Sequence, residues 1–433
     1  MERKLDLIVH AEKEHYHVGL CCRFDWVALS TVSHSAECSL EKGLTDFLNS
    51  YKHLYDTIGK IVMVIDAAEN FPSLLAETPR RIGYIRIAQD QYEPEYMMQL
   101  LAQNGGELLI ENIRPGRILK PSEAARIAER FLHAGITDVA ILGAFHFELS
   151  HERQMIINLL NRTATGRFTY HTLESQEYES FLLSENRLLA DACLKEALSR
   201  KVRQIEHVCR DLGYDAPLFL LSGEGYCLDL ASVLKDPLKS WQAEHAAKLI
   251  GASRLLRLSD AVAVSLVNDR IVIDRVKDNY PVAMGRTKQF FGLQISGPFT
   301  GAIEFSAARP RQRILEAIQT VNTEPGPLPI IDMTGGLLDS LELETERYII
   351  ESLESALITG AQCAPFRMDF YGSAPQSSTE DLLKASLHEE ADRWMASSRI
   401  RLRDFTAEYI SIKARYMKEG QKKGRMRISG HLE

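Results

Sequence analysis

The stretch from Asp215 to Arg286 constrains the fold more than any other segment, because its short elements follow one another in a definite order. They are a strand at 216–221, a helix at 245–256, a strand at 261–266 and a strand at 270–274. Continuous apolar runs that end at turn residues predict buried strands, and helices between such strands favour α/β layering. The last two strands are separated only by the short turn Val267-Asn-Asp269, which predicts a hairpin.

The rest of the chain continues this alternation of apolar strands and helices. Strands are predicted at 5–9, 18–22, 26–32, 60–66, 81–87, 139–142 and 330–333. Helices are predicted at 40–55, 121–133, 182–212 and about 340–358, and from Thr379 onwards. Pro121 and Ser122 at the start of one helix, and Gly135 after its end, are typical helix boundaries. The sequence therefore predicts an α/β protein with more than one layer.

The turn at 267–269 contains no glycine. Glycine lets backbone N–H groups approach a phosphate closely, and an aspartate beside such a turn holds the accompanying metal ion. The turn therefore lacks the residues that would contact a phosphate.

The order of elements resembles the A-type subunits of the hydantoinase/oxoprolinase family. The family's "DG" turn, "SGP" loop, "GA" helix and "D-x-G-G-T-T-T-D" strand end correspond to Gly223-Glu-Gly225, Ala243-Glu-His245, Gly251-Ala252 and Ser265–Asp269. Upstream segments that resemble family motifs are Val18–Asp25, Gly135–Leu142, Phe147–Glu152 and Glu185–Leu194. The resemblance runs in serial order over roughly residues 5 to 286.

The resemblance implies two actin-like (ribonuclease-H-like) α/β halves around a central cleft, with a modified helical C-terminal region. The expected domains are 1–170, a family-like α/β domain, 171–378, a second actin-like domain, and 379–433, a basic helical segment. In this last segment, residues 399–427 hold ten Lys or Arg against three acids. It is read either as a surface for an acidic partner or as a solvated helix with a frayed end.

Members of the family use ATP to open cyclic amides such as hydantoin or 5-oxoproline, and A-type chains work with a B-type partner. Here both phosphate turns, the "SGP" loop and the "DG" aspartate are replaced, and Arg23 at the first turn offers charge without the glycine geometry. We therefore expect a diverged protein that does not use ATP in the family's manner, acting as a structural or regulatory subunit or as a ligand-binding homologue. The alternative is an active ATP-dependent cyclic-amide hydrolase, with ATP and Mg²⁺ bound by unrecognised residues.

A B-type partner or a homo-oligomer is expected in either case. Acidic residues within the resembling segments are Glu148, Glu152, Glu185, Asp191 and Glu224. Glu224 is the candidate catalytic residue, because it keeps the carboxylate of the "DG" aspartate on a side chain one methylene longer.

The remaining phosphate-loop candidate is Asp332-Met-Thr334-Gly335-Gly336, an aspartate at a strand end followed by threonine and two glycines before a predicted helix. Backbone N–H groups at such a helix start bind anions; the other reading is an ordinary turn. Gly360 and Gly251 are further candidate cofactor-binding positions, and Gly360 is also read as the stop of a helix.

The N-terminal region is rich in metal-ligand residue types, and whether they bind a metal is left open. They are His10, His15, His17, Cys21, Cys22, His34 and Cys38. His15 and His17 would share one face of a strand, but no C-x-x-C or H-x-x-x-H spacing is present. Cys21 and Cys22 are also read as small core residues.

Composition narrows the class of protein. A net charge of −8 argues against a nucleic-acid binder, and no apolar run is long enough for a membrane helix. Seven cysteines, an odd number, argue against a disulfide framework and favour a cytoplasmic location.

Overall fold

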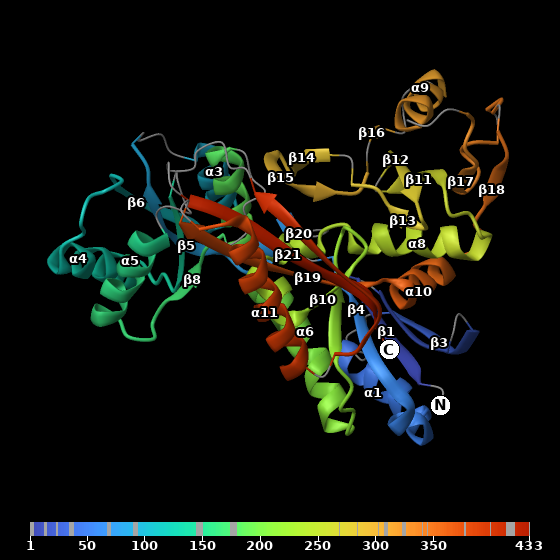
Figure 1. Ribbon diagram of the computed structural model, residues 1–433, viewed down its shortest axis with the longest axis horizontal. Coiled ribbons are helices and arrows are strands. Elements are labelled where there is room, and N and C mark those ends of the chain that lie inside the picture. The colour runs from blue at the N-terminus through green and yellow to red at the C-terminus, as the bar shows by residue number, and fades with distance from the viewer. Residues whose placement is uncertain are drawn as a thin grey trace.

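A computed structural model shows a mixed α/β protein built around several sheets (Figure 1). It describes residues 4–12, 15–22, 25–33, 39–66, 71–89, 94–143, 150–173, 180–267, 269–283, 285–301, 303–306, 311–322, 326–339, 341–343, 345–375, 378–398, 400–412 and 421–432. None of the helices in these ranges combines the length and apolar character that a membrane crossing requires.

The largest sheet has nine strands and includes both ends of the described chain. From edge to edge they are β20 (Leu402–Ile412), β21 (Gln421–Leu432), β19 (Phe366–Pro375), β10 (Cys227–Asp229), β9 (Leu218–Leu221), β4 (Ile58–Val64), β1 (Leu5–Ala11), β2 (His15–Cys22) and β3 (Asp25–Ser33). Strands β1, β2 and β3 form consecutive antiparallel pairs, while β1 and β9 both run parallel to β4. The predicted strands at 5–9, 18–22, 26–32 and 60–66 all lie in this sheet.

A four-stranded parallel sheet forms a second layer. Its order is β6 (Glu107–Ile113), β5 (Arg81–Ile87), β7 (Asp138–Gly143) and β8 (Thr169–His171). The neighbouring helices are α2 (Phe71–Glu77), α3 (Glu95–Gln103), α4 (Pro121–His133) and α5 (Ser150–Thr163). Helix α4 begins and ends at the predicted residues, because Pro121 at its first position and Gly135 with φ of 69° mark its limits.

The third sheet contains the predicted hairpin. Its path is β13 (Tyr280–Pro281), β12 (Arg270–Lys277), β11 (Ala261–Val267), β17 (Ile330–Met333) and β18 (Arg347–Ile349), and β16 (Ile303–Ser306) also pairs with β12. Strands β11 and β12 are antiparallel from Ala261 opposite Val276 to Val267 opposite Arg270, as predicted. A separate hairpin joins β14 (Gly285–Phe290) to β15 (Leu293–Phe299), and α9 (Arg311–Val321) packs beside the third sheet.

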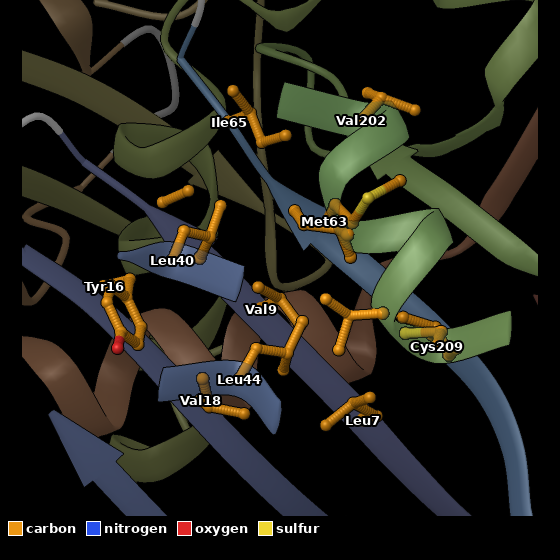
Figure 2. Packing of buried hydrophobic residues seen from close by; sticks show 14 of the residues in the cluster. Leu7, Val9, Tyr16, Val18, Leu40, Leu44, Met63, Ile65, Val202 and Cys209 are labelled. Carbon is orange, nitrogen blue, oxygen red and sulfur yellow. The ribbon is translucent and has the colours of Figure 1, made fainter. Parts of the chain in front are cut away.

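The long helix α6 (Phe181–Asp211) connects two hydrophobic cores. Its residues around Leu188–Leu194 pack with the four-stranded sheet, whereas Leu198 to Cys209 pack against the nine-stranded sheet. Figure 2 shows this second contact, where Val202 and Cys209 face Met63 of β4 and Val9 of β1, with Leu44 of α1 (Leu40–Ser50) alongside. The predicted domain boundary near residues 165–180 stays a prediction.

Two helices lie between the nine-stranded sheet and the third sheet (Figure 1). They are α8 (Ala243–Leu256) and α10 (Leu353–Cys363). The shorter helical elements are α7 (Leu230–Lys235) and the 3₁₀ segments Lys52–Thr57 and Pro237–Ser240.

The prediction of a helical C-terminal segment was wrong beyond residue 398. Helix α11 (Glu380–Ser397) is followed by two strands, β20 and β21, which complete the nine-stranded sheet. Met426 and Ile428 of β21 are buried against α11 and β19, while the intervening Arg427 donates to Asp369 of β19 at 3.0 Å. In β21, Arg425 and Arg427 alternate with the apolar Met426 and Ile428, which is a strand pattern. The high charge of the segment had favoured a solvated helix instead.

The prediction of a helix from about 340 to 358 was also wrong. Strand β18 pairs with β17 in parallel, with Ile331 opposite Tyr348. The helix begins only after Ser352, whose hydroxyl accepts a hydrogen bond from the Ser355 N–H at 3.1 Å. The apolar residues that suggested one helix therefore belong to two elements, a strand and a later helix that has its own N-cap.

Candidate functional site

The first turn of α8 is tied to both the nine-stranded and the third sheet. Gln242, the N-cap, donates its backbone N–H at 2.8 Å to Asp66, which lies just beyond β4. His245 lies 2.7 Å from Asp274 of β12, and both side chains are buried. The segment Ala243-Glu-His245, expected to replace the family's "SGP" loop, is therefore this first turn, and its side chains are fixed relative to both sheets.

Two histidines face each other beside this turn, on the first hairpin of the chain. His10 of β1 lies directly opposite His17 of β2 in the antiparallel register. Their rings stack with centroids 5.3 Å apart and planes 11° from parallel. Glu12, at the end of β1, places Oε1 3.6 Å from His10 Nδ1 and 3.9 Å from His17 Nε2. One donor atom from each of the three residues lies within 4.8 Å of the others.

A carboxylate also faces the second nitrogen of each ring. Glu244 of α8 lies 3.4 Å from His10 Nε2, and Glu354 of α10 lies 2.8 Å from His17 Nδ1. Burial raises the pKa of the Glu244 carboxyl, but hydrogen bonding to His10 and the charge of Lys248 outweigh it and hold that pKa well below its usual range. The pKa of Glu354 is also lowered: burial raises it, and the hydrogen bonds from Thr31 and His17 outweigh this. Both groups are therefore carboxylates at neutral pH.

Sequence analysis found only the two histidines of this group. His10 and His17 were among the predicted metal-ligand types, but the pairing considered was His15 with His17 along one strand. The actual pair is formed across two strands, and Glu12, Glu244 and Glu354 were not anticipated. The sequence does show one histidine in each of the two strands. Predicting that they lie opposite each other requires the register of the hairpin.

Of the other predicted N-terminal ligands, Cys21 and Cys22 are described and do not join the group. Cys21 is buried in the core, and burial raises the pKa of its thiol to about 12. This matches the reading of Cys21 as a small core residue. His34 and Cys38, like Arg23 of the expected first phosphate turn and Glu148, lie outside the described residues.

The Asp332 segment forms a turn that hydrogen-bonds to itself. The Thr334 N–H and hydroxyl both donate to Asp332 Oδ1, at 2.8 and 2.7 Å, and the Leu337 N–H donates to the Thr334 hydroxyl at 3.1 Å. Gly335 and Gly336 have φ of 68° and 105°, a conformation that favours glycine. The helix expected directly after the glycines is absent from the described residues 337–339, 341–343 and 345–346, which precede β18. The anion-binding role of this turn stays a prediction, without the helix N-terminus that motivated it.

Gly251 and Gly360 lie where α8 and α10 cross. A Cβ atom on Gly251 would lie 1.7 Å from the Ala356 carbonyl oxygen, and one on Gly360 would lie 1.8 Å from that of Ala247. Close helix packing therefore accounts for both glycines. The reading of Gly360 as a helix stop was wrong, because the helix continues to Cys363.

Glu224, the candidate catalytic residue, pairs with Arg367. The contact is 2.5 Å long, and Arg367 also donates to Asp369 at 3.0 Å. Arg367 is buried, and its guanidinium stacks over the Tyr226 ring at 5.0 Å. The structure thus gives Glu224 a structural partner.

Comparison with solved structures identifies the fold. The chain superposes on acetone carboxylase in its nucleotide-free form, an enzyme of ATP-dependent acetone carboxylation, with a TM-score of 0.63, 10% identity and coverage of 99% of this chain and 88% of that chain. It also matches an ATP-dependent caprolactamase from Pseudomonas jessenii, with a TM-score of 0.61, 12% identity and the coverage of 99% and 88%. No family model and no curated protein matches the sequence.

This chain shares a mixed α/β fold with both enzymes. The resemblance read from the serial order of short motifs is therefore confirmed as a likeness of fold.

Proposed function

We propose that this chain is a diverged member of the hydantoinase/oxoprolinase family that does not use ATP in the family's manner. It acts as a structural or regulatory subunit, or binds an altered ligand. In this proposal the nine-stranded sheet and the third sheet are the cores of two actin-like halves, with α8 and α10 between them. The likeness of fold to two ATP-dependent enzymes supports the ancestry.

The carboxylates around the first hairpin carry the proposal. Actin-like ATPases hold phosphate at the turn between two paired strands. Sequence analysis placed the family's first phosphate turn at Val18–Asp25, between β2 and β3. In this proposal the corresponding hairpin is instead that of β1 and β2, because His10 and His17 on these strands contact Glu244 of α8 and Glu354 of α10. Glu12 adds a third carboxylate there.

These carboxylates disfavour a polyphosphate. Two like unit charges 4 Å apart near a protein surface repel by about 4 kcal/mol, and a triphosphate brings several negative charges. Phosphoryl transfer requires donors and cations at this place. The carboxylates therefore place negative charge beside the hairpin, where nucleotide binding needs donors and cations.

An active ATP-dependent cyclic-amide hydrolase is the second candidate. Its support is that both similar structures are described as ATP-dependent. In such an enzyme ATP would phosphorylate the amide oxygen, and water would then attack the activated carbonyl carbon. The Asp332 turn would have to contribute to nucleotide binding.

Isothermal titration of the purified chain with magnesium-ATP and magnesium-ADP separates the two candidates, supported by a thermal-shift series. We expect no heat and no shift at millimolar nucleotide. Micromolar binding would overturn the proposal and favour the hydrolase, which assays with hydantoin and 5-oxoproline would then examine.

We further propose a cytoplasmic protein that assembles with a B-type subunit or with itself. Size-exclusion chromatography after co-expression with the genomic neighbours tests this assembly. A lone monomer in every combination would argue against it.

A further inference from the structure

One nitrogen of each ring, here called the inner nitrogen, lies near the same carboxylate oxygen of Glu12. His10 Nδ1 and His17 Nε2 both approach Glu12 Oε1, at 3.6 and 3.9 Å. These separations are longer than a hydrogen bond. His10 is 1% exposed, and its Nδ1 is buried with no hydrogen-bond partner. A buried polar atom left without a partner calls for an explanation, such as a bound ion.

The outer nitrogens are arranged as they are in metal centres. A histidine that binds a metal through one nitrogen usually directs the other towards a carboxylate, which fixes the ring and raises its basicity. Glu244 takes this position at His10 Nε2, at 3.4 Å, and Glu354 takes it at His17 Nδ1, at 2.8 Å. Each ring therefore has an outer carboxylate, and its inner nitrogen lies within 4 Å of the same Glu12 oxygen.

We propose that His10, His17 and Glu12 form a binding site for a divalent transition metal of the zinc class, with Glu244 and Glu354 orienting the two imidazoles. Two nitrogens and one carboxylate oxygen suit Zn²⁺. Three protein ligands leave a coordination position for water or a small ligand. Metal–ligand bonds of about 2.0–2.2 Å require donors closer together than they are here. Metal binding would therefore draw Glu12 inwards and rotate at least one imidazole out of the parallel arrangement.

The site goes beyond the proposed function, because it rests on the geometry of the β1–β2 hairpin and not on family ancestry. A bound dication would offset two of the three neighbouring carboxylate charges, and Lys248, which pairs with Glu244, offsets the third. The same residues that disfavour a nucleotide thus form a cation site. Zinc binding and nucleotide binding are measured separately, so either proposal can fail while the other stands.

The test begins with the metal content of the full chain. The protein is stripped with a chelator, dialysed and titrated with ZnSO₄ by calorimetry, with MgCl₂ as the comparison cation. Co²⁺ is then added in place of Zn²⁺, because its visible absorption reports tetrahedral nitrogen and oxygen ligands. We expect one Zn²⁺ per chain, no competition by Mg²⁺ at equal concentration, and a raised Tm in the zinc-loaded protein.

Variants assign the ligands. His17→Ala and Glu12→Gln should each weaken zinc binding by at least tenfold and remove the Co²⁺ spectrum. Glu354→Gln, which alters only the orienting carboxylate, should weaken it by about 10- to 100-fold. His207→Ala is the matched control, since His207 is an exposed histidine paired with Asp211 on α6. Circular dichroism checks the fold of each variant, and Glu12→Gln and Glu354→Gln change partly exposed side chains.

Two results would overturn the proposal. One is zinc binding no tighter than millimolar in the wild-type chain. The other is tight binding that survives in folded Glu12→Gln and His17→Ala proteins, because the metal would then be held elsewhere.

Discussion

Arg86 on β5 and Glu185 on α6 form a fully buried ion pair, with 2.9 Å between Arg86 Nε and Glu185 Oε1. Tyr84 donates to the same oxygen at 2.7 Å, and the Phe181 ring lies 4.8 Å from the Arg86 guanidinium. This pair connects the four-stranded sheet to the long helix. Glu185 belongs to the helix that resembles a family motif, and the structure shows that it is a core residue.

Replacing one member of this pair should strongly destabilise the protein. Glu185→Gln leaves the buried Arg86 charge without its carboxylate, which costs about 3–5 kcal/mol. Urea denaturation should show a lower midpoint at an unchanged slope. The double variant Arg86→Met with Glu185→Leu should recover much of the loss, because it removes both buried charges together. A loss below about 1 kcal/mol for Glu185→Gln would contradict the buried charge pair.

The crossing of α8 and α10 should not tolerate a side chain. Gly251→Ala and Gly360→Ala place a methyl group within 1.7 and 1.8 Å of carbonyl oxygens on the opposite helix. The helices must separate, and overpacking of this kind costs about 1–3 kcal/mol or more. Leu255→Ala on the exposed side of α8 is the control and should have a small effect. Thermal denaturation measures the difference, and equal Tm values for the three variants would argue against the tight crossing.

Removal of the Glu224 carboxylate distinguishes a structural role of this residue from a catalytic one. Glu224→Ala should lower the free energy of unfolding by about 1–3 kcal/mol, because buried Arg367 loses a charge-assisted hydrogen bond. Glu129→Gln, at an exposed position on α4, should leave stability unchanged. Any hydrolase activity found for the wild type should persist in a folded Glu224→Ala protein. A loss of several orders of magnitude in rate would instead give Glu224 a catalytic role.

Acid should weaken the sheet at Asp369. Burial raises the pKa of this carboxyl, but Arg367 and Arg427 outweigh burial and hold it below its usual value. The group therefore stabilises the fold above the unfolded-state pKa of about 4, and this contribution disappears as pH falls through the folded-state pKa. Asp369→Asn should be less stable at neutral pH, and its stability should fall less steeply below about pH 5. Urea denaturation midpoints of both proteins, measured across this pH range, test the prediction. The same pH dependence of the midpoint in both proteins would show that Asp369 is not responsible for the loss of stability in acid.

Local patterns were sufficient for much of the fold. The strand β4 and the helix α4 were predicted closely. A continuous apolar run indicates a strand that is buried on both faces, and residues such as Pro121 and Gly135 indicate the helix boundaries. The hairpin of β11 and β12 was predicted for the same reason. Strands β20 and β21 were missed. The alternating arginines of β21 are accommodated in a strand because partners such as Asp369 lie opposite them on β19, which the local sequence does not show.

Local sequence patterns were enough to predict the α/β class, the hairpins and helices with strong signals, and a turn at 267–269 without glycine. The three-dimensional contacts were needed to show that His10 faces His17, that Glu244 and Glu354 complete their surroundings, and that Glu224 pairs with Arg367. Helical and strand periodicity act over a few residues, whereas these contacts join residues that are far apart in the chain. They depend on strand register and on the approach of α8 and α10, which hydrophobic packing sets for the molecule as a whole.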